Sequence, residues 1–139
     1  MLARVLVPMD DSALSEEALR HALDAHPTAE ITVLHVVGGP SSMMGEAANV
    51  ALADDPEAEA SDHAKNVLAR AAEIAAEHDR EIETEVRIGH PARTIVDVAE
   101  EFDAVVIGSH SGTLAERLIV GNVAETIVRR SPVPVTVVR

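Results

Sequence analysis

The stretch Ala3–Ala25, ARVLVPMDDSALSEEALRHALDA, joins a strand to a helix. The run Ala3–Pro8 is short, apolar and rich in valine, as buried strands are. Asp11 or Ser12 then provides a polar side chain suited to the N-cap of a helix. From Ala13 to Ala25, leucine and alanine recur with the period of an α-helix. The stretch therefore predicts one β-α unit.

The same order of strand and helix recurs along the rest of the chain. Apolar or alternating runs predict strands over Ala29–Val37, Glu81–Ile88, Asp103–Gly108 and Val135–Val138, and helical periodicity predicts helices over Glu57–His78, Ala92–Glu101 and Asn122–Arg130. Strands that alternate with helices are typical of a parallel, doubly wound α/β sheet. The strand Glu81–Ile88 alternates apolar and charged residues, so we expect one wet face and a place at the sheet edge. The pattern contains no linker, and we expect one domain over residues 1–139.

The composition argues against several classes of function. The formal net charge is −13, with 24 acidic and 11 basic residues. Without a basic stripe we expect no nucleic acid as partner, and an anionic membrane surface would repel such a chain. Cysteine is absent, which excludes disulfides and thiol chemistry. We find no run long enough to span a membrane and no signal peptide, and we expect a cytoplasmic location.

Two strand ends carry residues suited to a ligand. In doubly wound sheets, ligands bind beyond the carboxyl ends of the strands, where the winding reverses. The first strand ends in Pro8-Met9-Asp10, and the fourth ends in Gly108-Ser109-His110-Ser111-Gly112. If these strands are neighbours, the two loops share one crevice.

The segment Gly108–Asn122 has the composition of a phosphate site. Gly108 and Gly112 permit close approach of an anion to backbone N–H groups, and serine hydroxyls lie between them. Gly121 and Asn122 open the last predicted helix, whose N-terminus attracts anions through its free N–H groups and its dipole. These residues predict a site for the phosphates of a nucleotide.

Structural roles explain several of the same residues. Asp10 can accept a hydrogen bond from a ribose hydroxyl, but it can equally help to cap the first helix. Asn122 is itself a good N-cap, and a Gly–Ser turn after a strand is often only a turn. His110 fits an ordinary loop residue, and His35, in mid-strand, fits a hydrogen-bonded residue of the core or of a sheet edge. The residues alone leave these alternatives open.

Five segments together resemble the universal stress protein family, and the resemblance covers nearly the whole chain. They are Val7-Pro8-Met9-Asp10-Asp11-Ser12, the strand Val33–Val37 (VLHVV), Gly89-His90-Pro91-Ala92, Val106–Gly112 (VIGSHSG) and Pro132–Val138 (PVPVTVV). The resemblance implies a Rossmann-like fold similar to the adenine nucleotide alpha-hydrolases. That fold has a five-stranded parallel sheet of order 3-2-1-4-5, with helices on both faces and strands one and four side by side. It also implies a homodimer, often formed through the last strand.

One branch of this family binds ATP through the motif G-x-x-G-x9-G-[ST], which this chain matches in part. Gly108 and Gly121 align with the first and last glycines, whereas Ser111 stands at the second glycine and Asn122 at the Ser/Thr position. A serine costs on the order of 1 kcal/mol where a positive φ is required.

The resemblance assigns roles to particular residues of this chain. It implies that Asp10 contacts ribose, that the backbone near Val36 and Val37 contacts adenine, and that the glycine segment surrounds ribose and phosphates. The expected binding residues are Pro8, Met9, Asp10, Val36, Val37, Gly108, Ser109, His110, Ser111, Gly112, Gly121, Asn122 and Val123. The implied ligand is ATP or AMP, and Mg²⁺ or Mn²⁺, where present, rides on the phosphates.

Three functions compete on this basis. The first is a stress-response module that binds ATP or AMP, and the second is a nucleotide-free dimeric interaction protein from the other branch of the family. The third is an enzyme of phosphoryl transfer, which needs a placed metal, a cationic residue and a group that orients water. No Walker-type lysine motif occurs, and the one lysine, Lys65, falls in the second predicted helix. We expect a binding module with at most very slow ATP hydrolysis.

Overall fold

The computed structural model describes residues 3–37, 56–109 and 122–139, with the backbone alone over 56–61. Strands and helices alternate in these ranges as the sequence predicts. They are β1 (Arg4–Pro8), α1 (Ala13–Ala25), β2 (Glu30–Val37), α3 (Pro56–Glu77), β3 (Glu83–Ile88), α4 (Pro91–Ala99), β4 (Ala104–Gly108), α5 (Asn122–Arg130) and β5 (Val135–Val138). The helices α1 and α5 and the strand β5 have the predicted bounds, and the other elements differ only at their ends.

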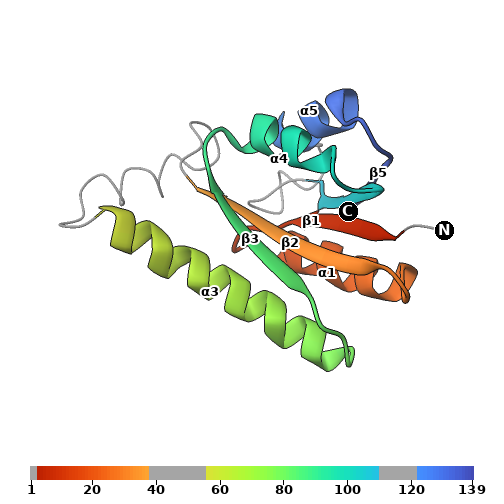
Figure 1. The fold of residues 1–139 in the computed structure, drawn as a ribbon, viewed down its shortest axis with the longest axis horizontal. Coiled ribbons are helices and arrows are strands. Elements are labelled where there is room, and N and C mark those ends of the chain that lie inside the picture. Colours follow the sequence, from red (N-terminus) through yellow and green to blue (C-terminus); the bar gives the residue numbers. More distant parts are fainter. Residues whose placement is uncertain (1–2, 38–55, 110–121) are drawn as a thin grey trace.

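The strands form one parallel, five-stranded sheet of order β3-β2-β1-β4-β5, which confirms the predicted fold class and strand order. Helices cover both faces: α1 and α3 lie on one face, and α4 and α5 lie on the other (Figure 1). The chain winds from β1 outward to β3, returns to the centre, and winds outward again from β4 to β5. The winding therefore reverses between β1 and β4, where ligands bind in folds of this kind.

Each layer of helices packs on its own apolar core. On the first face, strand residues such as Val7 and Val33 meet Leu19 of α1 and Ile74 of α3, all fully buried or nearly so. On the second face, Leu6 and Leu34 meet residues of α4 and α5, including Ile95 and Ile127. The central strands are apolar on both faces because both faces are covered.

The helix ends follow from local side-chain and turn chemistry. Ser12 caps α1, since its Oγ accepts a hydrogen bond of 3.2 Å from the Ser15 N–H. After α3, Asp79 takes a left-handed φ of 54°, and the N–H groups of Asp79 and Arg80 donate to the carbonyls of Ala76 and Ala75. This is a Schellman ending, with aspartate where glycine is usual. Among the described helices, none has the length and apolar character that a membrane crossing requires.

The strand β3 lies at the sheet edge, as its alternating pattern predicts. The apolar face of this strand, however, is not the buried one. Val86 and Ile88 are 43% and 81% exposed, whereas Glu85 is half-buried. Among the described residues, α3 and α4 cover the neighbouring β2 but leave most of β3 open. The alternation of apolar and charged residues in β3 therefore predicts its place at the sheet edge correctly, but it does not identify a buried face.

Candidate functional site

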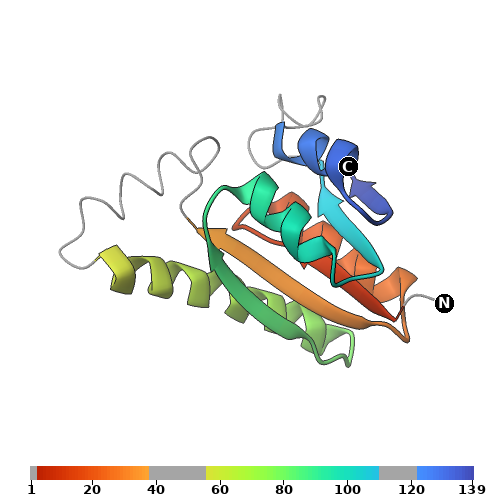
Figure 2. The same ribbon diagram turned by 45° about the horizontal axis from the view of Figure 1, so that its top comes forward.

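The strands β1 and β4 lie side by side at the reversal of winding (Figure 2). Their register pairs Val5 with Ala104 and Leu6 with Val105, and the pairing ends there. Counted onward from these pairs, Asp10 stands level with Ser109. By contrast, β1 stays paired with β2 as far as Pro8 and Leu34. Pairing of β1 with β4 thus ends two residues earlier along β1 than pairing with β2. The ends of β1 and β4 therefore diverge at the sheet edge where the sequence predicts the ligand.

The turn after β1 is held by hydrogen bonds around Asp10. Its Oδ1 accepts from the Ser12 N–H at 2.8 Å, and its carbonyl accepts from the Ser15 Oγ at 3.1 Å. Asp10 therefore does organise the start of α1, as the structural alternative predicts, although Ser12 is the N-cap. Its second carboxylate oxygen, Oδ2, accepts no hydrogen bond from the described residues. The side chain is half-buried, so it can serve a ligand and the turn together.

Met9 ties this turn to the sheet. Its N–H donates to the Leu34 carbonyl at 2.8 Å, and its carbonyl lies 2.9 Å from Nδ1 of His35. A carbonyl only accepts, so Nδ1 carries the proton and donates. The Met9 side chain is 4% exposed and packs in the core, and Pro8 before it is half-buried. Met9 thus fixes where β1 ends.

The end of β2 extends past the end of β1. The Leu34 carbonyl points toward β1, since it accepts from Met9, and the Val37 carbonyl points toward β3, since it accepts from the Gly89 N–H at 2.9 Å. Backbone groups of successive strand residues point alternately to the two sides, so the N–H and C=O of Val36 point to the β1 side. Of the two residues expected to contact adenine, Val36 directs its backbone toward the proposed crevice, and Val37 is paired with β3.

Gly108 ends β4 in close contact with α1. A Cβ at this position would lie 3.1 Å from both Cγ and the carbonyl oxygen of Leu14. Its φ is not among the positive values, which in the described residues occur at Asp79 and Gly89. The first turn of α1 therefore leaves little room for a side chain at this position, a reason for glycine that the sequence does not reveal.

Ser109 follows at the carboxyl end of β4 and is 2% exposed. Its N–H donates to the Val138 carbonyl at 2.8 Å. Its Oγ is buried and has no hydrogen-bond partner among the described residues. A buried hydroxyl without a partner costs about 1–3 kcal/mol, so this oxygen calls for a functional explanation.

The start of α5 supplies the last part of the expected site. Asn122 is exposed at the helix N-terminus, and its carbonyl accepts from the Thr126 Oγ1 at 2.9 Å. Val123 is half-buried and packs on the core beneath α4 and α5. The expected site residues His110, Ser111, Gly112 and Gly121 lie outside the described residues. In the ranges that are described, no three His, Asp or Glu side chains gather as metal ligands would.

His35 has a structural role that the sequence does not reveal. It is fully buried, as expected for a hydrogen-bonded core histidine. Its bond to Met9, however, reaches directly from β2 to the turn that precedes Asp10. The sequence signal is the one histidine inside the largely apolar run ITVLHVV, and only the register of β1 on β2 shows which residue this histidine contacts.

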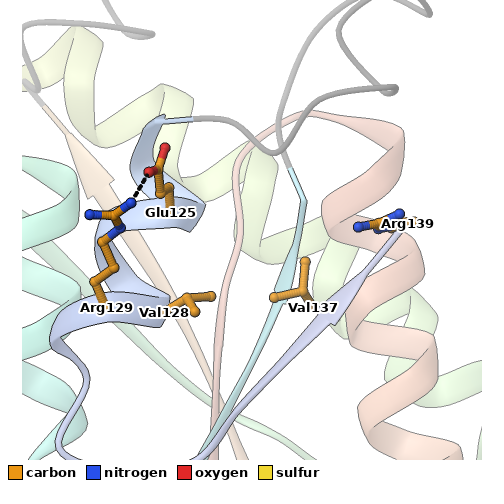
Figure 3. A pocket seen from close by; sticks show the side chains of 5 residues that line it. All are labelled: Glu125, Val128, Arg129, Val137 and Arg139. Atoms are coloured by element: carbon orange, nitrogen blue, oxygen red, sulfur yellow. Dashed lines mark ion pairs between the residues drawn. The ribbon is translucent and has the colours of Figure 1, made fainter.

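A further groove lies between α5 and β5 (Figure 3). Val128 and Val137 form its apolar floor, and Val128 is 50% exposed. Glu125 and Arg129 pair across one turn of α5 at 2.9 Å, and Arg139 lies on the opposite side. The groove borders the edge strand β5 and shares no residue with the expected nucleotide site.

The fold and the divergent ends of β1 and β4 define a doubly wound α/β protein with a ligand-site geometry at its switch point. The family model described as "Universal stress protein family" matches residues 1–139. The chain therefore belongs to the universal stress protein family, as its sequence motifs indicate.

Individual relatives agree with this assignment over nearly the whole of this chain and most of their own length. The chain is 30% identical to universal stress protein MJ0531 of Methanocaldococcus jannaschii, over 98% of this chain and 81% of that protein. The solved structure of universal stress protein UspA from Lactobacillus plantarum superposes with a TM-score of 0.75 and 26% identity, covering 99% and 97% of the two chains. A universal stress protein solved in complex with cAMP superposes with a TM-score of 0.70 and 28% identity, covering 99% and 97%.

Proposed function

We propose that this protein binds an adenine nucleotide, ATP or AMP, between the carboxyl ends of β1 and β4, and acts as a cytoplasmic regulatory module in a stress response. The observation that carries the proposal is the Ser109 hydroxyl, buried at the end of β4 without a described partner. A ligand oxygen at this position would satisfy it. The relative solved with cAMP, an adenine nucleotide, supports the choice of ligand.

The end of β2 offers the hydrogen bonds that adenine needs. The Watson–Crick edge of adenine presents an acceptor, N1, beside a donor, the N6 amino group. Val36 presents a backbone donor and acceptor on one side of the strand, beyond the last β1–β2 pair. Guanine presents the opposite arrangement on the same edge, so this backbone favours adenine.

Asp10 and the start of α5 suit the remaining parts of a nucleotide. The Asp10 Oδ2 can accept a hydrogen bond from a ribose hydroxyl while Oδ1 keeps the turn in place. The free N–H groups at the start of α5 attract phosphates, and Gly108 and Gly121 keep the spacing of the family motif. We expect any Mg²⁺ or Mn²⁺ to be held mainly by the phosphates, as is usual for nucleotide sites.

We further propose that the protein acts as a homodimer, with β5 and the groove beside it at the interface. The strand β5 pairs with β4 on one side, and it is an edge of the sheet. Val128 and Val137 supply apolar area, and Arg129 and Glu125 supply charges of both signs. Such a surface complements a second copy of itself, as a two-fold interface requires. Without nucleotide binding, this dimer would remain as the interaction protein of the alternative hypothesis.

The substitution Ser109→Ala tests the nucleotide site, because it should affect the stability of the protein and its nucleotide affinity in opposite directions. Removal of a buried, unpartnered hydroxyl should leave the ligand-free protein as stable as wild type or up to about 1 kcal/mol more stable. Loss of the same hydroxyl should weaken ATP or AMP binding by on the order of tenfold. Urea unfolding and calorimetric titration measure the two effects.

Ser131→Ala is the matched control, because Ser131 bonds to Val133 at the opposite end of the sheet. It should leave nucleotide affinity unchanged. Absence of wild-type binding at millimolar ATP and AMP would reject the proposal in favour of the nucleotide-free interaction protein.

A further inference from the structure

A regular parallel ladder between β1 and β2 would continue beyond its last pair. The Met9 N–H donates to the Leu34 carbonyl, so the next bond would run from the Val36 N–H to the Met9 carbonyl. The pairing instead ends at Pro8 and Leu34. The Met9 carbonyl accepts its hydrogen bond from Nδ1 of His35, at 2.9 Å.

We propose that His35 is a positioning residue for adenine: its imidazole takes the Met9 carbonyl out of the ladder and so keeps the Val36 N–H available to the base. The inference rests on the proposed function and deepens it, since it explains how a backbone site for adenine stays open. His35 touches no ligand in this account and acts through Met9 and Val36.

Three features fit His35 for this role. Its side chain is fully buried, so its position is set by the core rather than by solvent. Its ring lies against that of His63 in α3, with the centroids 5.4 Å apart, which restricts its rotation. Its Nδ1 donates to the carbonyl of Met9, the residue before Asp10. One hydrogen bond therefore fixes both the end of β1 and the path of the chain into Asp10, the residue expected to contact ribose.

Two amide variants separate the role of Nδ1 from burial of a polar group. An asparagine amide nitrogen stands as many bonds from Cα as Nδ1 does, and a glutamine amide nitrogen stands one bond further, as Nε2 does. His35→Asn should therefore still donate to Met9, whereas His35→Gln should not. Both variants place one amide in the same buried site, so they are matched in polarity.

The first readout needs no nucleotide. In the wild type and in His35→Asn, we expect the Val36 amide to exchange its hydrogen faster than the ladder amides that flank it. In His35→Gln the Met9 carbonyl can rejoin the ladder, and the Val36 amide should become protected, measured by NMR hydrogen exchange. In the wild type, the ¹⁵N shifts of the ring should show a protonated Nδ1. Equal protection of Val36 in all three proteins, or an unprotonated Nδ1, would overturn the inference.

The second readout is base selectivity. His35→Gln should bind ATP more weakly by on the order of tenfold, the value of one hydrogen bond, and should discriminate less between ATP and GTP. His35→Asn should keep the wild-type preference. If His35→Asn loses the preference as fully as His35→Gln, the Met9 bond is not responsible. A wild type that binds no ATP, with Val36 exchange as expected, would instead reject the proposed function.

Discussion

Gly108 shows how one residue can satisfy two requirements. The sequence suggests that this glycine lets an anion approach the backbone, and the structure adds that α1 packs directly upon it. A Cβ at this position would have the Leu14 carbonyl oxygen and carbon among its nearest atoms, at 3.1 and 3.2 Å. Backbone atoms in the first turn of a helix move aside less readily than a side chain does, so the position disfavours larger residues even without a ligand.

Gly108→Ala should therefore destabilise the ligand-free protein by about 1–3 kcal/mol, the usual cost of overpacking. Urea unfolding measures this change. Because the obstacle includes backbone, truncation by Leu14→Ala should not rescue the variant, and the coupling in the double-mutant cycle should stay below about 0.5 kcal/mol. A Gly108→Ala protein as stable as the wild type would show that α1 does not pack against this position as described.

Among the elements, β1 and β4 are fastened at their amino ends by one carboxylate. The Asp103 Oδ2 accepts from the N–H groups of Arg4 and Ala3, at 2.9 and 3.0 Å. The Arg4 guanidinium lies 4.5 Å from the centre of the Phe102 ring, and its NH1 donates to the Glu101 carbonyl. Hydrogen bonds from Arg4 and Ala3 hold the pKa of Asp103 below its ordinary value. The contact lies at the end of the sheet opposite the proposed nucleotide site, so we expect it to act on the stability of the fold alone.

The lowered pKa gives this contact a defined pH dependence. A carboxyl whose pKa is lower in the folded state stabilises the protein above its unfolded pKa, about 3.9, and this contribution is lost as pH falls through the folded pKa. Asp103→Asn should therefore be less stable than the wild type at pH 7, and the gap should narrow below about pH 4. Urea midpoints from pH 7 to pH 3 test this, with the exposed Asp97 of α4 changed to asparagine (Asp97→Asn) as the control. A gap that stays constant with pH would contradict the role assigned to Asp103.

The helices and strands also show how much of the fold the sequence predicts. Periodicity predicted α1, α5 and β5 with their observed bounds, because helical and strand periods reflect local burial. The family motifs gave the strand order, which spacing alone does not contain. The apolar face of β3 was misleading, because exposure at an edge depends on which helices reach it. The contacts of Gly108 with Leu14 and of His35 with Met9 join residues distant in the chain, so no local pattern could reveal them.

At the scale of the whole molecule, the two sheet edges offer different surfaces. The β3 edge exposes Val86 and Ile88, but Glu83, Glu85 and Arg87 alternate with them, and charges on an edge strand discourage pairing. The β5 edge adjoins the apolar floor formed with Val128 (Figure 3). This contrast favours β5 as the edge that meets a second copy, in agreement with the dimer that the family resemblance implies.

Val128→Glu should weaken the dimer at least tenfold, since it places a charge in the apolar part of the interface. Val86→Glu is the control, because Val86 is similarly exposed, at 43% against 50% for Val128 of α5, and lies on β3 at the opposite edge of the sheet. Sedimentation over a range of micromolar concentrations measures both. If Val86→Glu dissociates the dimer and Val128→Glu has no effect, the interface lies at β3 and not at β5. A monomeric wild type would reject the proposed dimer.

Titration of ¹⁵N-labelled wild-type protein with ATP, followed by NMR, tests the central claim most directly. The amides of Asp10, Val36 and Ser109 come from three strand ends that the fold brings to one edge of the sheet. We predict that the resonances of all three amides shift together along one saturable binding curve. The amide of Val137, beside the β5 groove, should make no direct contact with ATP. No shift at millimolar ATP, or saturable shifts confined to the groove at α5 and β5, would contradict a nucleotide site between β1 and β4.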